Sequence, residues 1–264
     1  MLISFVSAKG APGVTTVVSA IGGVWNSDVV VADLDPAGSD FALRHRKVNG
    51  EPVDPDRGLL SMAAAARRGM LSPGEVHEHT QELDGGMEIL SGVTRPEQIA
   101  GIGSVWPTIG NTLRDMSADV LADCGRTAPG TPVMPVLSAS DAVIFVVRPT
   151  VEDYAHLRER LRWLVEPLRI GQAGAVPVGI VLVAPSKESN VGRDLDRLLQ
   201  SEQLQVSVLG RIAMDPKAAD TIAGRTVRRI DRSLLVRSAR EVAGSIRAMA
   251  AARPNAAARA ANQG

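Results

Sequence analysis

The chain alternates between short apolar runs and longer amphipathic segments. Seven of the apolar runs predict strands, and most of them lack the polar alternation of a strand with one solvent-exposed face. Such unbroken runs are typical of strands covered on both faces, as in a parallel sheet between two layers of helices. The predicted strands are 2–6, 29–33, 87–90, 119–123, 142–147, 178–183 and 206–210.

Six intervening segments have the apolar spacing of amphipathic helices. They are 13–25, 59–68, 96–116, 151–168, 190–200 and 232–250. The alternation of strands and helices predicts an α/β fold, a doubly wound and mostly parallel β-sheet flanked by helices. We expect a single domain over residues 1–250, followed by a disordered tail containing alanine and arginine over residues 251–264.

The composition fits a folded protein of the cytoplasm. Of the 264 residues, 45% are hydrophobic, which is enough for a sizeable core. The single cysteine, Cys124, excludes an internal disulfide and fits a reducing compartment. Crossing a bilayer takes roughly 20 consecutive apolar residues, and no run approaches that length. We therefore expect a soluble, cytoplasmic protein.

Charge is distributed unevenly along the chain, although the formal net charge is +0. Nine arginines against Asp231 and Glu241 give the C-terminal part from Arg225 onward a charge of +7, so the rest carries −7. Such a basic segment suits an anionic partner, and non-specific DNA contact is one interpretation. The arginines are Arg225, Arg228, Arg229, Arg232, Arg237, Arg240, Arg247, Arg253 and Arg259.

The last predicted helix has an apolar stripe that we expect to pack on the sheet. It lacks the tryptophan and phenylalanine that anchor helices at membrane surfaces, so a membrane role is not favoured. The stripe consists of Leu235, Ala239, Val242, Ile246 and Met249.

The loop AKGAPGVTT, residues 8–16, joins the first predicted strand to the first predicted helix. Backbone amides from Gly10 to Thr16 would converge at the helix N-terminus, where unpaired donors and partial positive charge favour phosphate. The hydroxyl of Thr15 is a suitable ligand for Mg²⁺, which prefers oxygen. A glycine–proline turn that merely caps a helix is the alternative interpretation of this stretch.

Carboxylates follow two further predicted strands. Asp33 and Asp35 lie two residues apart at the end of one strand, so they project to the same side and suit a magnesium or water-positioning role. Asp123 ends another strand before a Cys-Gly turn, where it could hold a magnesium-bound water. Taken singly, each could be an ordinary loop carboxylate. Because parallel strands end at one rim of a sheet, the three loops together predict a nucleotide–magnesium site.

Together these residues resemble the ParA/MinD family of deviant Walker-A ATPases, whose loop reads K-G-G-x-G-K-[ST]-[ST]. The residues that match this loop are Lys9, Gly10, Gly13, Thr15 and Thr16. The segment 33–36, DLDP, resembles the family's switch I, Asp123 its Walker-B aspartate, and the following CGR the start of switch II. Segments 141–161 and 209–225 are similar to the family's second half, so the resemblance covers roughly residues 1–250.

The resemblance implies ATP and Mg²⁺ as cofactors and a homodimer as the working state. Lys9 would reach the partner's phosphates, Asp35 would order the attacking water, and these two are the catalytic candidates. Mg²⁺ would be held, directly or through water, by Thr15, Asp33 and Asp123. The phosphates would be cradled by Lys9, Gly10, Ala11, Pro12, Gly13, Val14, Thr15 and Thr16.

Val14 is the main departure, because it occupies the position of the family's second loop lysine, which bridges the β- and γ-phosphates. Loss of one preorganised cation beside a transferring phosphate typically costs several kcal/mol of transition-state stabilisation. Binding can survive through the amides, Mg²⁺ and Lys9, so we expect weak or absent hydrolysis. Ala184 and Pro185 stand where many relatives have an asparagine against adenine, which leaves the base open.

The first functional hypothesis is a dimeric positional scaffold similar to the TadZ/CpaE branch of the family. It would place secretion, pilus or division machinery at a pole or septum, to which a protein partner recruits it. The alternative is an active ATPase that cycles on DNA or membrane during chromosome or plasmid partitioning or division-site selection. A third hypothesis is an interaction module that no longer binds nucleotide.

Overall fold

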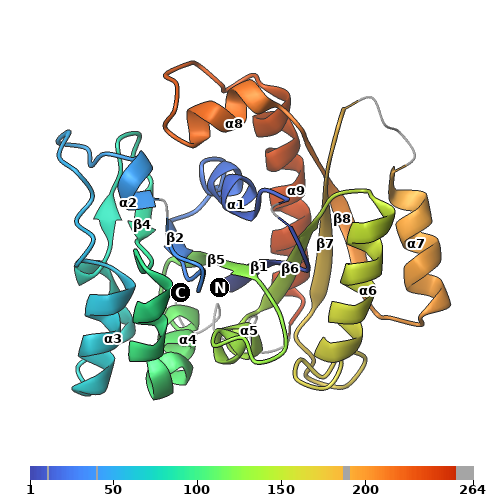
Figure 1. The fold of residues 1–264 in the computed structure, drawn as a ribbon, viewed down its shortest axis with the longest axis horizontal. Coiled ribbons are helices and arrows are strands. Elements are labelled where there is room, and N and C mark those ends of the chain that lie inside the picture. The colour runs from blue at the N-terminus through green and yellow to red at the C-terminus, as the bar shows by residue number, and fades with distance from the viewer. Residues whose placement is uncertain (11, 40, 187–190, 254–264) are drawn as a thin grey trace.

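The computed structural model describes residues 1–10, 12–39, 41–186 and 191–253. Within them, one eight-stranded sheet has the strand order β3-β4-β2-β5-β1-β6-β7-β8 (Figure 1). Only the pair β3 and β4 is antiparallel among the described strand pairs. The strands are β1 (Leu2–Ser7), β2 (Val29–Asp33), β3 (Gln81–Glu82), β4 (Glu88–Leu90), β5 (Asp119–Arg126), β6 (Ala142–Val147), β7 (Val178–Ala184) and β8 (Ser207–Ala213).

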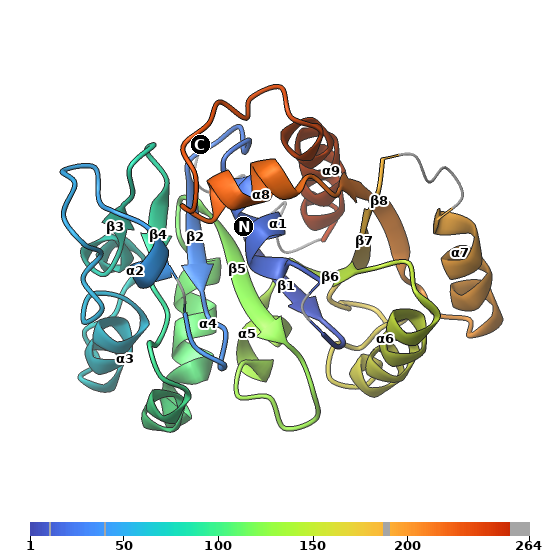
Figure 2. The same ribbon diagram turned by 45° about the horizontal axis from the view of Figure 1, so that its top comes forward.

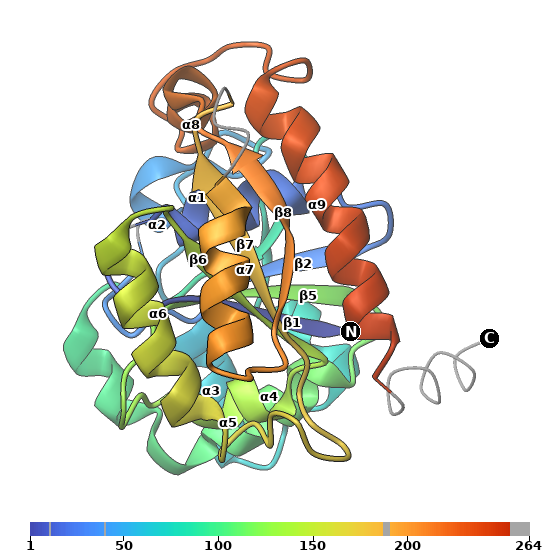
Figure 3. The same ribbon diagram turned by 90° about the vertical axis from the view of Figure 1, so that its right-hand side faces the viewer.

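Helices lie on both faces of this sheet (Figures 1 and 3), which confirms the predicted doubly wound α/β fold. The α-helices are α1 (Val14–Gly22), α2 (Phe41–Arg44), α3 (Leu59–Arg67), α4 (Trp106–Arg114), α5 (Met134–Ala139), α6 (Val151–Leu164), α7 (Val191–Ser201), α8 (Pro216–Ile222) and α9 (Leu234–Ala251). The 3₁₀ helices are η1 (Pro73–Glu78), η2 (Pro96–Gly101) and η3 (Gly103–Val105).

Two apolar clusters explain the unbroken hydrophobic runs. Leu2 and Val6 of β1 pack in the cluster that the helices from α3 to α7 share, whereas Ile3 and Phe5 pack with α1, α8 and α9. Successive side chains of a strand point to opposite faces, so a strand covered on both faces is apolar at most of its positions. All of β1 is buried.

The last helix packs as its apolar stripe predicts. Its stripe belongs to the cluster shared with α1, and α9 runs along β8 (Figure 3). Leu235, Ala239, Val242 and Ile246 are buried, and Met249 is partly buried against the same cluster. Among the described helices, none is both long and apolar enough to cross a membrane.

Several element boundaries differ from the predicted ones. Segment 96–116 forms η2, η3 and α4 instead of one helix, because Gly103 adopts φ +53° and Pro107 opens a new helix. β8 continues through Gly210 and Arg211 to Ala213, since pairing with β7 extends it beyond the apolar run. The spacing does not predict α2, α5 or β3, which are too short for a periodic pattern.

The ends of two predicted segments lie in parts of the chain that are not described. Position 190, where one predicted helix begins, lies outside the described residues, and α7 starts at Val191. α9 ends at Ala251, and the expected tail lies outside the described residues from position 254 onward.

The strand order brings three loops to one rim. β5 lies between β2 and β1, and all three are parallel, so their carboxyl ends are adjacent. Asp33 pairs in register with Asp123 across β2 and β5. Figure 2 shows the β1–α1 connection beside these strand ends, with α8 lying over α1. The sheet therefore assembles the three loops that carry the predicted site.

Candidate functional site

The loop after β1 adopts a conformation that requires glycine. Gly10 has φ +69° and Gly13 has φ +97°, both in the left-handed region that residues with a Cβ disfavour. Gly13 is the N-cap of α1, and no described side chain caps this end of the helix. The first amides of a helix have no intrahelical acceptor, so they are available to an anionic oxygen at the rim. Position 11, predicted as part of the phosphate loop, lies outside the described residues.

A short hydrogen bond joins α1 to β5. The hydroxyl Oγ1 of Thr15 donates to Oδ2 of Asp123 at 2.6 Å, and the amide of Gly125 donates to Oδ1 of the same carboxylate at 3.0 Å. The Asp123 side chain is 1% exposed. The structure thus brings together two of the three predicted magnesium ligands.

Asp33, the third predicted ligand, is also buried, at 3% exposure. Burial and, to a smaller extent, the nearby Asp123 carboxylate raise the pKa of Asp33 to about 8, against the opposing effect of hydrogen bonds from Ser39 and the Asp35 amide. Burial likewise raises the pKa of Asp123 to about 6, with the hydroxyl of Thr15 opposing the shift. Two buried carboxyl groups at adjacent strand positions are a donor set suited to a divalent ion.

Asp35 lies at the turn after β2 and packs directly on Gly125, near the end of β5. Its Oδ1 accepts the amide of Ala37 at 2.8 Å. A Cβ added at Gly125, which has φ +61°, would lie only 2.2 Å from Cγ of Asp35. The two segments that the sequence identifies as switch-like are therefore in contact, although the predicted Cys-Gly turn is part of β5, which continues beyond Asp123 to Arg126.

Val14 contributes packing and no polar group to the rim. It is 7% exposed and lies in the apolar cluster that also contains Ile3 and Phe5. The neighbouring Pro12 is buried too, whereas Thr15 and Thr16 remain partly exposed. The loop thus presents hydroxyls and amides.

Lys9 is exposed and contacts α6. Its Nζ lies 2.9 Å from Nε2 of His156, a distance at which a neutral imidazole accepts a hydrogen bond from the ammonium. In this single chain, the predicted inter-subunit lysine is therefore held at the side of the loop by α6.

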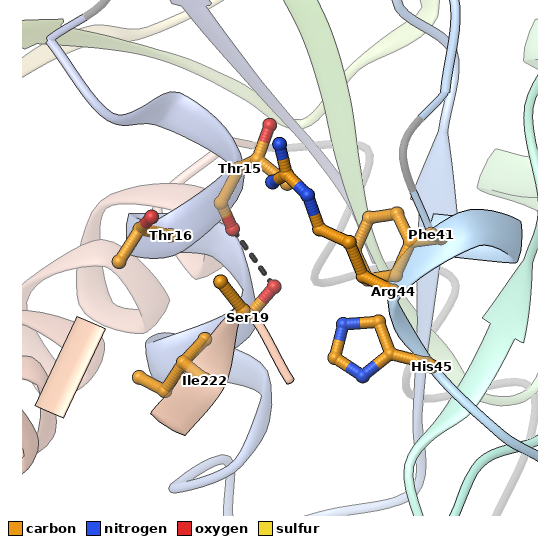
Figure 4. A pocket seen from close by; sticks show the side chains of 8 residues that line it. Thr15, Thr16, Ser19, Phe41, Arg44, His45 and Ile222 are labelled. Carbon is orange, nitrogen blue, oxygen red and sulfur yellow. Dashed lines mark hydrogen bonds between the residues drawn. The ribbon is translucent and has the colours of Figure 1, made fainter. Parts of the chain in front are cut away.

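Two pockets flank the start of α1. The first lies between α1, α2 and the end of α8, and in it Thr15 and Ser19 lie on the side of Arg44 and His45 (Figure 4). The second has a volume of about 140 Å³ and is mostly apolar. Its lining includes Pro12, Gly13 and Thr16, Arg148 after β6, and the residues from Ile212 to Pro216 after β8.

Arg44 is a residue of this region that the sequence does not single out. It ends the short helix α2, which follows the Asp35 turn by a few residues. That position in the chain is its only sequence signal, because an arginine in a basic run such as LRHRK is typical of a solvated surface.

The basic C-terminal segment begins beside this region. Arg225, Arg228, Arg229 and Arg232 are exposed in the connection from α8 to α9, and the Arg225 guanidinium forms an ion pair of 2.8 Å with Asp220. Four exposed guanidinium groups within eight residues form a concentrated positive surface.

Comparison with known proteins gives a structural match and no sequence match. No protein-family model matches the chain, and no curated protein sequence matches it. A ParA family ATPase from Chlorobium tepidum TLS superposes with a TM-score of 0.68 at 15% identity, covering 92% of this chain and 96% of that one.

Two further structures are similar over nearly their whole length. A putative plasmid partition protein from Borrelia burgdorferi B31, bound to AMPPNP, has a TM-score of 0.69 at 13% identity and covers 94% and 98% of the two chains. The septum site-determining protein MinD from Pyrococcus horikoshii OT3, complexed with Mg-ADP, has a TM-score of 0.66 at 17% identity, with 93% and 95% covered. The chain therefore has the fold of the ParA/MinD ATPases, as its sequence motifs predict.

Proposed function

We propose that the protein binds a nucleoside triphosphate together with Mg²⁺ at the rim formed by β1, β2 and β5. The observation that carries the proposal is the 2.6 Å hydrogen bond between Thr15 and Asp123 at the open N-terminus of α1. It places a hydroxyl and a carboxylate next to free helix amides, which is the combination that a magnesium–phosphate group requires. The nucleotides bound to two structures of the same fold support it.

Thr15, Asp33 and Asp123 would hold the magnesium ion, directly or through water. The ion would neutralise charge on the phosphates when bound. The chain's own contribution is to keep both carboxylates buried and adjacent, while the Gly10–Thr16 loop offers its amides to phosphate oxygens. Asp35, packed on Gly125, would orient a water molecule near the same phosphate.

We further propose that the protein acts as a dimeric positional scaffold with weak or absent hydrolysis. Val14 is buried among apolar side chains, so position 14 supplies no ammonium to the phosphates. Lys9 is exposed beside the loop and would leave His156 to contact the phosphates of a second copy. A protein partner of a secretion, pilus, division or partition system would recruit the dimer from the cytoplasm to a pole or septum.

The base would occupy the pocket that begins at Pro12 and Gly13. This pocket is lined mainly by apolar groups, and Asp215 at its edge caps α8 by accepting the amide of Ala218 at 3.2 Å. With Ala184 and Pro185 at the end of β7, the described residues supply no asparagine there, so binding should discriminate weakly between adenine and other purines.

Calorimetry combined with light scattering tests the proposal. ATP with Mg²⁺ should bind and shift the protein from monomer to dimer, while ADP should bind without a comparable shift. Asp123→Asn keeps the shape of the side chain but removes its charge, and it should abolish the magnesium dependence of binding. Flat titrations with ATP and ADP at millimolar concentration would contradict the proposal and support an interaction module that binds no nucleotide.

An active ATPase is the second candidate, favoured by the position of Asp35 against Gly125 of β5. Rates of ATP hydrolysis measured with and without DNA, lipid vesicles or a candidate protein partner distinguish the scaffold from the active ATPase. A scaffold should hydrolyse ATP slowly in all conditions, whereas a cycling ATPase should be stimulated by its partner. Val14→Lys should raise turnover if the remaining site is intact.

DNA is the anionic partner that the exposed arginines after α8 would suit. Replacing Arg228, Arg229 and Arg232 by glutamine should weaken binding to duplex DNA and flatten its dependence on salt concentration. Equal salt slopes for the variant and the natural protein would argue against DNA contact at this surface.

A further inference from the structure

The proposed nucleotide site gathers three carboxyl groups near the start of α1. Asp33, Asp35 and Asp123 lie at its base, and a bound triphosphate would bring several negative charges beside them. Val14, buried in the apolar cluster, provides no countercharge, and Lys9 is engaged with His156 on the α6 side of the loop. A cation from another element would balance the phosphates when they bind.

Arg44 is placed to supply that charge. It lines one pocket together with Thr15 and Thr16, the two hydroxyls at the start of α1, and its guanidinium extends toward the Thr15 end of that pocket (Figure 4). Among the eight described residues that line this pocket, Arg44 is the one with a permanent positive charge. The neighbouring His45 does not add to it, because burial and the Arg44 charge lower the His45 pKa.

The backbone around Arg44 is held on two sides. Phe41 is buried and stacks on His45 with ring centroids 5.4 Å apart. Its backbone amide donates a hydrogen bond to the Ser39 hydroxyl. On the other side, a Cβ at Gly224 would lie 2.3 Å from the Arg44 carbonyl oxygen, so the turn after α8 packs tightly on it. The exposed guanidinium therefore extends from a fixed base.

We propose that Arg44 contacts the phosphate chain of the bound nucleotide and replaces, from α2, the positive charge that Val14 does not provide. The inference rests on the proposed nucleotide binding. A guanidinium can donate two parallel hydrogen bonds to phosphate oxygens, which suits a group that reaches the phosphates from outside the loop. It makes α2 part of the binding site and couples it to the turn after α8.

Calorimetric titration of two glutamine variants with Mg²⁺ and either ATP or inorganic tripolyphosphate tests this role. Arg44→Gln should weaken binding of both ligands about tenfold or more, since a charge-assisted hydrogen bond is lost. Arg46→Gln is the matched control, because Arg46 is exposed two residues away and does not line the pocket. Its affinities should stay within about twofold of those of the natural protein.

A charge rescue separates phosphate contact from a structural effect. In the Arg44→Gln background, Val14→Lys should restore at least part of the lost affinity, and melting curves would confirm that the double variant is folded. Equal ATP affinities for Arg44→Gln and Arg46→Gln would overturn the role of Arg44 while leaving nucleotide binding intact. No binding by the natural protein would overturn the proposed function and this inference with it.

Discussion

The Thr15 hydroxyl donates a 2.6 Å hydrogen bond to the Asp123 carboxylate, although 108 positions separate the two residues. Thr15 lies in the first turn of α1, the helix after β1, and Asp123 lies in β5, the strand beside β1. The hydrogen bond connects the loop that resembles a phosphate-binding loop, residues 8–16, to the acidic residues at the rim of the sheet.

Removing the Thr15 hydroxyl should affect both stability and binding. Thr15→Val leaves one oxygen of the buried Asp123 without its donor, which should lower the free energy of unfolding by about 1–3 kcal/mol. Binding of ATP with Mg²⁺ should weaken by about tenfold or more. Urea unfolding and calorimetry measure the two effects.

Ser19→Ala is the matched control for Thr15→Val, because its hydroxyl donates within α1 to the carbonyl of Thr15 at 2.8 Å. The free energy of unfolding should change by no more than about 0.5 kcal/mol. Equal decreases in the free energy of unfolding for Thr15→Val and Ser19→Ala would show that the Thr15–Asp123 hydrogen bond does not contribute specifically to stability.

The contact between Asp35 and Gly125 can be isolated with two alanine variants. Gly125→Ala combines a left-handed φ with a clash against Asp35, whereas Gly130→Ala has φ +80° and nothing within 4 Å. Gly130→Ala should lower the unfolding free energy by about 1 kcal/mol, and Gly125→Ala by about 1–3 kcal/mol more. Urea denaturation provides both values.

A double variant tests whether the Asp35 carboxylate causes the additional decrease in unfolding free energy expected for Gly125→Ala. Asp35→Ala removes the atoms that a Cβ at position 125 would meet, so it should relieve the clash in the Gly125→Ala background. Strict additivity of the two substitutions would show that Asp35 is not the obstacle.

Stability without metal should fall as pH rises from about 4 to about 8. Burial raises the pKa of Asp33 to about 8 and that of Asp123 to about 6, from an ordinary value of 3.8. The folded state binds these protons more tightly than the unfolded state, so their stabilisation is complete below pH 4 and is lost as the carboxyls ionise. The loss should be on the order of a few kcal/mol.

Asp33→Asn checks the source of this pH dependence, since asparagine keeps a neutral side chain at every pH. Urea unfolding in EDTA should show a much flatter profile for the variant, and Mg²⁺ should reduce the loss in the natural protein. Parallel profiles for the two proteins would exclude Asp33 as the titrating group.

Lys9 and His156 should affect dimer formation in opposite directions. Lys9→Ala should abolish the ATP-dependent increase in mass, because the proposed contact with a second copy is lost. His156→Ala should raise the dimer fraction, since it removes the 2.9 Å contact that holds Lys9 on its own subunit. Light scattering with ATP and Mg²⁺ measures both.

Lys47→Ala is the control for the lysine variant, because Lys47 forms an exposed pair of 2.6 Å with Glu51 away from the loop. It should dimerise as the natural protein does. A dimer that forms normally with Lys9→Ala would contradict the role of Lys9 between subunits.

The sequence by itself determined the fold class and most of the sheet. Apolar runs such as 142–147 predict strands covered on both faces, and their alternation with amphipathic segments predicts helices between them. The local sequence also determined the backbone conformation of the loop after β1, since Gly10 and Gly13 adopt the positive φ that glycine allows. Segment 96–116 was the main error, because its apolar spacing continues across glycines that end the regular helix.

Only the tertiary structure decided which side chains meet. Asp33 and Asp123 become neighbours because β5 pairs with β2, and Arg44 faces Thr15 because α2 and the turn after α8 pack beside α1. The burial that raises the carboxyl pKa values, and that places Val14 among apolar side chains, also comes from this packing. Local sequence patterns specify backbone conformation, whereas desolvation and charge proximity depend on segments far apart in the chain.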